Sequence, residues 1–286
     1  MRNLVAIGAL LASAALITTP AMAQDVAAAP AAQQVTAGGA PAEADPGSGS
    51  TTTTATVKKD SGLGSAEPAK APEAVAAAEP TPPFALSMTL AGVSDYRFRG
   101  ISLSDLKPAF QPSVTLTHSS GLHVGAWGSN LAHNDGDSIE LDLVAGYGKT
   151  IGPITFDVSA TEYVYPGVRS INYVEFIGTA SHAFGNFTLG GTFAYTPRQR
   201  LAAPTRGIYG AVNAAYAIPT TPLTLTGSFG IEDNGFYDNK KDWSFGISAE
   251  LAGFTVGAAY VDSAHNFGDP HGRGRAVFSI SRSFSS

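Results

Sequence analysis

The chain contains no cysteine and little charge. The absence of cysteine from its 286 residues excludes disulfide bridges, thiolate metal sites and a thiol nucleophile. Charged residues make up only 14% of the sequence, against about 25% in an average soluble domain. Beyond the N-terminal segment, no apolar run reaches the ~18 residues that a transmembrane helix needs. These absences disfavour both a disulfide-stapled secreted domain and a helical membrane protein.

A surplus of positive charge is also missing. The formal net charge is −6, and no basic cluster with interleaved aromatic residues occurs. Nucleic-acid-binding domains need a basic stripe, so we expect no nucleic-acid partner. The sequence has no G-x-S-x-G motif, and its histidines lack a metal-ligand spacing. We therefore predict no enzyme activity, no cofactor and no metal site.

The N-terminus carries an export signal. Arg2 is followed by an apolar core over Leu4–Ile17 and by the small-residue site Ala21-Met22-Ala23. This order predicts that residues 1–23 are a secretory signal peptide; an N-terminal membrane anchor is the alternative. An exported chain without cysteine fits the envelope of a Gram-negative bacterium.

Residues 24–83 consist mostly of Ala, Pro, Thr, Gly and Ser and contain no aromatic residue. So few large apolar side chains cannot offset the entropy lost when a chain becomes ordered. We predict a disordered periplasmic tether, because Pro/Ala-rich stretches usually act as spacers. A segment that crosses the cell-wall mesh or docks a partner is the alternative.

From Phe84 onward the chain repeats one unit, about ten residues of alternating apolar and polar side chains followed by a break. Alternation with period two places every second side chain on one face of a β-strand. The predicted strands are Phe84–Phe98, Phe110–His118, Leu122–Ser129, Ile139–Tyr147, Ile154–Ser159, Tyr173–Phe184, Phe187–Thr196, Ile208–Ala217, Leu223–Phe229, Asp242–Ser248, Phe254–Tyr260 and Arg275–Phe284. An exported chain with an even number of strands predicts an all-β fold, a transmembrane antiparallel up-and-down β-barrel of about 12 strands over residues 84–286.

The breaks between the predicted strands alternate in length. Short breaks fall at 119–121, 150–153, 185–186, 219–222 and 252–253, and long breaks at 100–109, 130–138, 166–172, 197–207, 232–241 and 262–274. Outer-membrane barrels have short periplasmic turns and longer extracellular loops. The alternation therefore predicts the cell outer membrane as location, with both termini in the periplasm.

A soluble β-sandwich or lipocalin-type barrel would also alternate, but it hides its apolar face inside. Here the apolar phase carries aromatic residues toward strand ends, which suits interfacial girdles. These residues are Tyr96, Phe98, Tyr147, Tyr195, Trp243 and Tyr260. The polar phase is mostly Ser, Thr, Gly and acids and is low in Lys, a poor exterior for a soluble protein.

The first predicted hairpin resembles a known family. Residues Ser94–Ser102, followed by Asp105 and Lys107–Ala109, are similar to the opening motif of the TorF family of porin-like barrels. Trp127–Asn130 and Glu140–Leu143 resemble the next two blocks of that family. The resemblance covers roughly 84–284 and implies an outer-membrane barrel with a channel role. It brings no catalytic residues with it and defines no substrate.

Charged side chains in the polar phase are predicted to line the pore, because an Arg that faces lipid near the midplane costs ~2–4 kcal/mol. The candidates are Asp95, Arg97, Arg99, Glu140, Asp142, Asp157 and Glu175. An excess of inward acids predicts weak cation preference in a passive channel for small hydrophilic solutes. The alternative is a structural barrel whose lumen is filled by paired charges and which anchors the periplasmic tether.

The expected partners follow from the predicted location. Basic residues in the long breaks, such as Lys107, Lys240 and Arg273, are natural partners for outer-membrane lipids and lipopolysaccharide phosphates. Ordinary solvated loops are the alternative, because acids such as Asp105 and Asp269 are mixed among these bases. The C-terminal region around Phe284 is the expected contact with the barrel assembly machinery. A barrel lipase or protease is a further alternative, because His118-Ser119-Ser120 places an imidazole beside hydroxyls. That triplet lies at a short turn, however, and adjacent strand residues face opposite sides.

Overall fold

The structure is a computed structural model that describes residues 83–134, 137–167, 171–199, 203 and 205–286. The predicted signal peptide (1–23) and nearly all of the predicted tether (24–83) lie outside these residues and stay predictions. Within the described ranges, no helix is long and apolar enough to cross a membrane.

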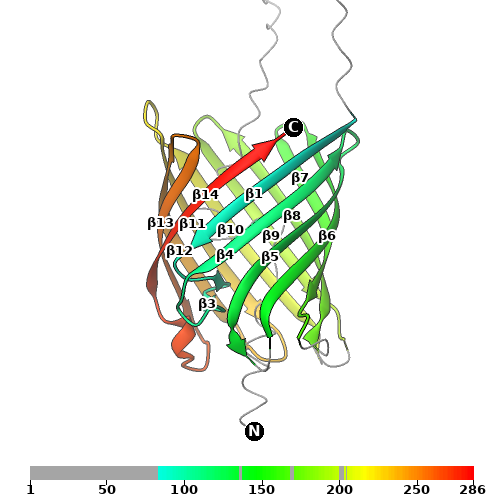
Figure 1. Ribbon diagram of the computed structural model, residues 1–286, viewed down its shortest axis with the longest axis vertical. Helices are drawn as coiled ribbons and strands as arrows, with labels where there is room; N and C mark the ends of the chain where they lie inside the picture. Colours follow the sequence, from blue (N-terminus) through cyan, green and yellow to red (C-terminus); the bar gives the residue numbers. More distant parts are fainter. Residues whose placement is uncertain (1–82, 135–136, 168–170, 200–202, 204) are drawn as a thin grey trace, which may run out of the picture. The chain divides into compact units, whose positions relative to one another are not determined.

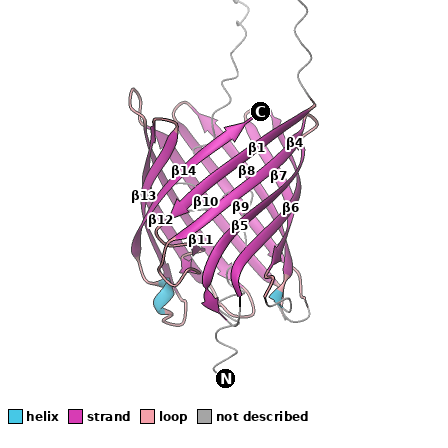
Figure 2. Ribbon diagram, in the orientation of Figure 1, coloured by secondary structure: helices cyan, strands magenta, loops and turns pink. Residues whose placement is uncertain are grey.

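Twelve antiparallel strands form one closed barrel (Figures 1 and 2). They are β1 (Phe84–Val93), β4 (Ala109–His118), β5 (Leu122–Asn134), β6 (Asp137–Ile151), β7 (Ile154–Val164), β8 (Tyr173–Phe184), β9 (Phe187–Thr196), β10 (Gly207–Ala217), β11 (Leu223–Asp233), β12 (Lys240–Leu251), β13 (Phe254–Ala264) and β14 (Arg275–Ser285). Each strand pairs with its neighbours in the chain, and β1 pairs with both β4 and β14 to close the barrel. The predicted up-and-down barrel is therefore confirmed.

The short turns gather at one end of the barrel, together with the start of β1 and the C-terminus (Figure 1). In the two-residue turn between β12 and β13, Ala252 and Gly253 both have positive φ values, +52° and +79°. Two consecutive left-handed residues make a turn whose twist matches that of the flanking strands. Such turns set the register of the hairpins and keep this end of the barrel compact.

All predicted strand starts lie within two residues of those in the structure, and β8 and β9 have the predicted bounds. The predicted ends of β6, β7, β11, β12 and β13 are three to five residues too early. The first prediction is wrong at its end, because β1 stops at Val93 and not at Phe98. The predicted break over 130–138 is also wrong: β5 runs to Asn134 and β6 begins at Asp137, with an irregularity in their register. Both strands extend beyond the alternating pattern because their backbones continue to pair with each other.

The two faces of the barrel wall differ sharply in chemistry. The outer face carries large exposed apolar side chains on every strand, among them Val212, Phe245 and Phe278, whose exposed fractions are 58%, 65% and 60%. The inner face carries buried polar and charged side chains such as Glu140 and Asp242. This is the inverse of a soluble barrel, which encloses its apolar residues.

Candidate functional site: the barrel lumen and its inserted hairpin

The segment between β1 and β4 folds back into the barrel. It contains a short two-stranded hairpin, β2 (Arg97–Phe98) and β3 (Ile101–Ser102). All ten residues from Asp95 to Ser104 are buried, although they connect strands at the end of the barrel that carries the long connections. We call Ser94–Ser104 the lumen hairpin.

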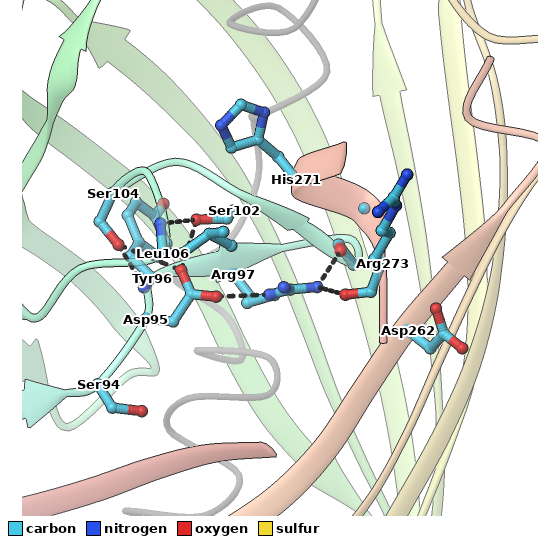
Figure 3. A network of polar contacts seen from close by, with 12 residues as sticks. Ser94, Asp95, Tyr96, Arg97, Ser102, Ser104, Leu106, Asp262, His271 and Arg273 are labelled. Atoms are coloured by element: carbon cyan, nitrogen blue, oxygen red, sulfur yellow. Dashed lines mark hydrogen bonds and ion pairs between the residues drawn. The ribbon is translucent and has the colours of Figure 1, made fainter. Parts of the chain in front are cut away.

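Internal polar contacts give the lumen hairpin its shape (Figure 3). Asp95 accepts hydrogen bonds from the hydroxyl of Ser102 and from Arg97 Nε, the latter at 2.7 Å. Arg97 Nη1 donates to the carbonyl of Gly100 at 3.0 Å and to that of Arg273, in the β13–β14 connection, at 2.9 Å. These bonds hold Arg97 along the hairpin and tie the hairpin to a second loop.

Arg99 occupies the tip of the hairpin and reaches the opposite wall of the barrel. Its guanidinium donates to Glu232 on β11 at 2.8 Å and to both oxygens of Glu175 on β8 at 3.1 Å. It also lies over the ring of Tyr209 on β10, 4.1 Å from the ring centroid. In strand order, β8, β10 and β11 lie across the barrel from β1 and β4, so the hairpin spans the lumen.

A buried lysine completes this charge network from β12. Lys240 Nζ donates to the backbone carbonyl of Arg99 at 2.6 Å and lies 3.0 Å from Glu232 and 3.8 Å from Asp242. Asp242 in turn accepts from the hydroxyl of Tyr209 at 3.1 Å. We call Arg99, Glu175, Glu232, Lys240, Asp242 and Tyr209 the tip network. Its two cations offset most of the charge of its three carboxylates in a setting where unpaired ions would be costly.

The base of the hairpin packs against an aromatic and apolar cluster that begins at β5 and continues along the wall to β10. Tyr96 contacts Trp127 of β5 with ring centroids 5.4 Å apart, and Leu103 O accepts from the backbone of Ala132 at 2.7 Å. The buried cluster also includes Phe98, Tyr163, Tyr165, Tyr173 and Ile177. The hairpin thus has an apolar attachment at its base and a charged attachment at its tip.

Two acids on β6 lie inside the wall near the aromatic cluster. Glu140 and Asp142 are 0% and 2% exposed, and their spacing of two residues places them on the same face of the strand. Asp142 Oδ1 has no hydrogen-bond partner among the described residues. Over the part of the chain that the structure describes, no cluster of His, Asp or Glu is suited to hold a metal ion.

Toward the short turns the lumen holds a cavity of about 420 Å³, which we call the short-turn chamber. Hydroxyl groups are prominent in its lining, from Thr115, Thr155, Thr179, Ser181, Thr188 and Thr226. His123 Nε2 and Asp157 Oδ2 face each other in its wall at 3.6 Å. The volume suits a small molecule, and the hydroxyl groups offer it hydrogen-bond partners within a lining that is otherwise largely apolar.

All seven predicted pore-lining residues lie inside the barrel, but in different settings. Asp157 borders the short-turn chamber, while Glu140, Asp142 and Glu175 are buried on the wall. The remaining three, Asp95, Arg97 and Arg99, belong to the lumen hairpin and not to the first strand. Whether these seven line a conducting pore stays a prediction.

Other expectations require correction. Tyr96 and Phe98, expected in a lipid-facing girdle, are buried in the lumen. Lys240, expected at the outer rim, is 0% exposed and belongs to the tip network. Glu232 and Tyr209 were missed: Glu232 was assigned to a loop, and Tyr209 has no charge to mark it. The sequence held one signal for this network: Glu232 and Lys240 lie at the adjoining ends of β11 and β12, where an acid and a lysine can pair.

Outside the barrel wall, Asp105 makes a small polar cluster with Lys107 and His271. Lys107 Nζ donates to Asp105 Oδ2 at 2.7 Å, and His271 Nε2 lies 3.3 Å from Oδ1. These hydrogen bonds, first that from Lys107, lower the pKa of Asp105 below its ordinary value. The cluster lies at the surface, between the β3–β4 connection and the short helix η2 (Pro270–Gly272).

A known protein family matches most of the chain. Residues 77–284 match the family described as "Bacterial protein of unknown function (Gcw_chp)". No curated protein matches the chain. The description does not carry the TorF name, so that resemblance stays a prediction.

Solved porins show a distant likeness. A KdgM porin in complex with disordered oligogalacturonate is 10% identical over 70% of this chain and 99% of its own, with a TM-score of 0.48. The NanC porin is 10% identical over 70% and 98%, with a TM-score of 0.46. OprD from Pseudomonas aeruginosa is 9% identical over 70% and 65%, with a TM-score of 0.38. Likeness at this level carries no argument, and the barrel rests on the strand pairing itself.

Proposed function

The chain belongs to the bacterial family Gcw_chp, whose function is unknown, and we propose that it is an outer-membrane barrel that forms a narrow passive channel for small hydrophilic solutes. In this proposal the protein is not an enzyme. Its short turns and both termini face the periplasm, as the TorF resemblance and the loop lengths predict.

The outer face of the wall is the observation that carries the membrane part of the proposal. Large apolar side chains are exposed on all twelve strands, whereas monomeric soluble proteins rarely expose contiguous apolar patches larger than a few hundred Å². A closed barrel leaves no unpaired strand edge and therefore satisfies its backbone groups in lipid. Lipopolysaccharide at the loop end and the assembly machinery at the Phe284 end remain the proposed partners.

The inner face supports the channel part. The short-turn chamber of about 420 Å³ is bordered by hydroxyl groups and by the His123–Asp157 pair. Water and small polar solutes can exchange their hydrogen bonds with such a lining. The lumen hairpin narrows the opposite half, which agrees with a small conductance and not with a wide pore.

Single-channel recording tests the proposal. Purified full-length protein, folded in detergent and added to a planar phospholipid bilayer in 1 M KCl, is expected to give discrete conductance steps. Heat-denatured protein is the control for detergent artefacts. A folded protein that inserts into the bilayer and never conducts contradicts the channel.

The lumen hairpin favours a second candidate, a structural barrel with a filled lumen that anchors the N-terminal segment. Its ten buried residues and the aromatic cluster occupy the loop half of the barrel. The two candidates differ in conductance alone, so the same recording separates them.

A further inference from the structure

We propose that the lumen hairpin, Ser94–Ser104, is a gate whose latch is the contact of Arg99 with Glu175 and Glu232. The gate rests on the proposed channel function and describes its regulation. With the hairpin in the lumen the loop half is closed. With its tip released, the short-turn chamber communicates with the loop end of the barrel.

The position of the hairpin is that of a crossbar. Its two ends join β1 and β4, which are neighbours in the wall, and its tip contacts β8 and β11 on the far side and β12 next to β11. A segment attached at one side of a pore and held at the other obstructs passage through it. Releasing the tip alone is sufficient to clear the far side.

The chemistry of the two attachments differs, and this difference makes the tip the part that releases. The base is held by apolar and aromatic contacts such as Tyr96–Trp127, and by the covalent chain. The tip is held by charged groups, whose burial costs much of what their pairing returns. The wall residues that the tip would leave behind are charged. Water in an open lumen can therefore replace the hydrogen bonds that they make with the tip.

Strain and unsatisfied polar atoms also mark the closed tip. Arg99 is a non-glycine residue with a φ of +44°, followed by Gly100 at +83°. A side chain in the left-handed region costs free energy that the surrounding contacts must offset. Arg99 Nε and Arg97 Nη2 are buried without a hydrogen-bond partner among the described residues. Both atoms would gain water on opening, which lowers the cost of release.

The first experiment compares the gating of the unmodified protein and three variants in a planar bilayer. Arg99→Gln removes the charge of the latch, and Glu175→Gln removes one of its acceptors from the wall, so the hairpin itself stays intact in the second variant. We expect either change to raise the fraction of time spent at the larger conductance level by about tenfold, since a hydrogen bond to a charged group is lost. Arg206→Gln, an exposed loop residue outside the tip network, is the matched control and should gate like the unmodified chain.

The second experiment reads hairpin motion without conduction. Because the chain has no cysteine, Ile101→Cys introduces a single thiol at the tip, where the native side chain is 1% exposed. A hydrophilic maleimide should label it slowly in the otherwise unmodified protein and about tenfold faster with Arg99→Gln or Glu175→Gln. Phe267→Cys, at a position that is 81% exposed, should react rapidly in every background.

The outcomes separate the gate from the channel. Unchanged labelling and unchanged open fraction in both folded variants overturn the gate and leave the channel in place. Faster labelling in a protein that never conducts contradicts both proposals. The hairpin then moves, but there is no channel for it to gate. Arg99→Lys, which retains the charge without the bidentate geometry, should lie between Arg99→Gln and the unmodified protein in both readouts.

Discussion

Single buried charges in the lumen depend on their partners. Lys240 and Glu232 are 0% and 1% exposed and lie 3.0 Å apart. Lys240 also supports Asp242 and the backbone carbonyl of Arg99. Removing one member of a buried ion pair leaves the other uncompensated, which is far more costly than the loss of a surface pair.

We therefore expect Lys240→Met to lower the free energy of unfolding by about 3–5 kcal/mol. Lys241→Met is the matched control, because the neighbouring residue points to the other face of β12 and pairs with the outward-facing Ile231. Urea titration of the folded protein in phospholipid vesicles measures both. Equal effects of the two substitutions would contradict the buried network.

At the surface, the pH response of Asp105 provides a test of the loop contacts. Because the pKa of Asp105 is lowered from its ordinary 3.8, its contribution to stability is present above about pH 4 and is lost as pH falls through the lowered pKa. A carboxyl ¹³C titration should give a midpoint below 3.8. Lys107→Gln removes the strongest hydrogen bond to Asp105 and should return the midpoint toward the ordinary value.

At the scale of the strand, the sequence pattern predicts which side chains face which way. In β9 the exposed Leu189 and Phe193 alternate with the buried Thr192 and Ala194, as expected from period two. The pattern works because one face meets lipid or solvent and the other meets the lumen. When the two faces of a strand meet different surroundings, the sequence alone predicts which side chains point to each face.

The position and contacts of the lumen hairpin could not be predicted from this pattern. Asp95, Arg97 and Arg99 alternate with Tyr96 and Phe98, so the segment continues the pattern of β1. Both of its faces are buried, however, one in the tip network and one in the aromatic cluster. Period two cannot distinguish a wall strand from a segment enclosed on all sides, and the contacts of Arg99 come from residues 76 and 133 positions away.

The two faces of β10 give a prediction with an internal control. Val212 lies at the middle of the strand and is 58% exposed, while the adjacent Asn213 borders the short-turn chamber. Val212→Arg should lower the free energy of unfolding in a bilayer by ~2–4 kcal/mol, as expected for an arginine placed in lipid near the midplane. Asn213→Arg should leave stability nearly unchanged and alter conductance. Denaturant titration in vesicles measures stability, and single-channel recording measures conductance. A greater loss of stability in Asn213→Arg than in Val212→Arg would contradict a wall whose apolar face meets lipid.

For the whole barrel, the distribution of buried charge predicts ion preference. The interior carries the buried acids Asp95, Glu140, Asp142, Glu175, Glu232 and Asp242, against the buried bases Arg97, Arg99 and Lys240. An acidic lumen raises the local concentration of cations. We expect a reversal potential that indicates preference for K⁺ under a KCl gradient, and a stronger preference after Arg99→Gln. Preference for Cl⁻ in the unmodified protein would contradict this distribution.

The seam between β1 and β14 has a consequence for biogenesis. β1 is the first barrel strand to be synthesised and β14 the last, yet they are hydrogen-bonded side by side from Ser87–Ser285 to Val93–Ser279. A nascent chain cannot close the barrel until β14 has been synthesised, since β14 supplies the partner of β1. If the chain takes the proposed route to the outer membrane, the edges of β1 and β14 stay unpaired until the barrel closes, and unpaired strand edges are prone to aggregation.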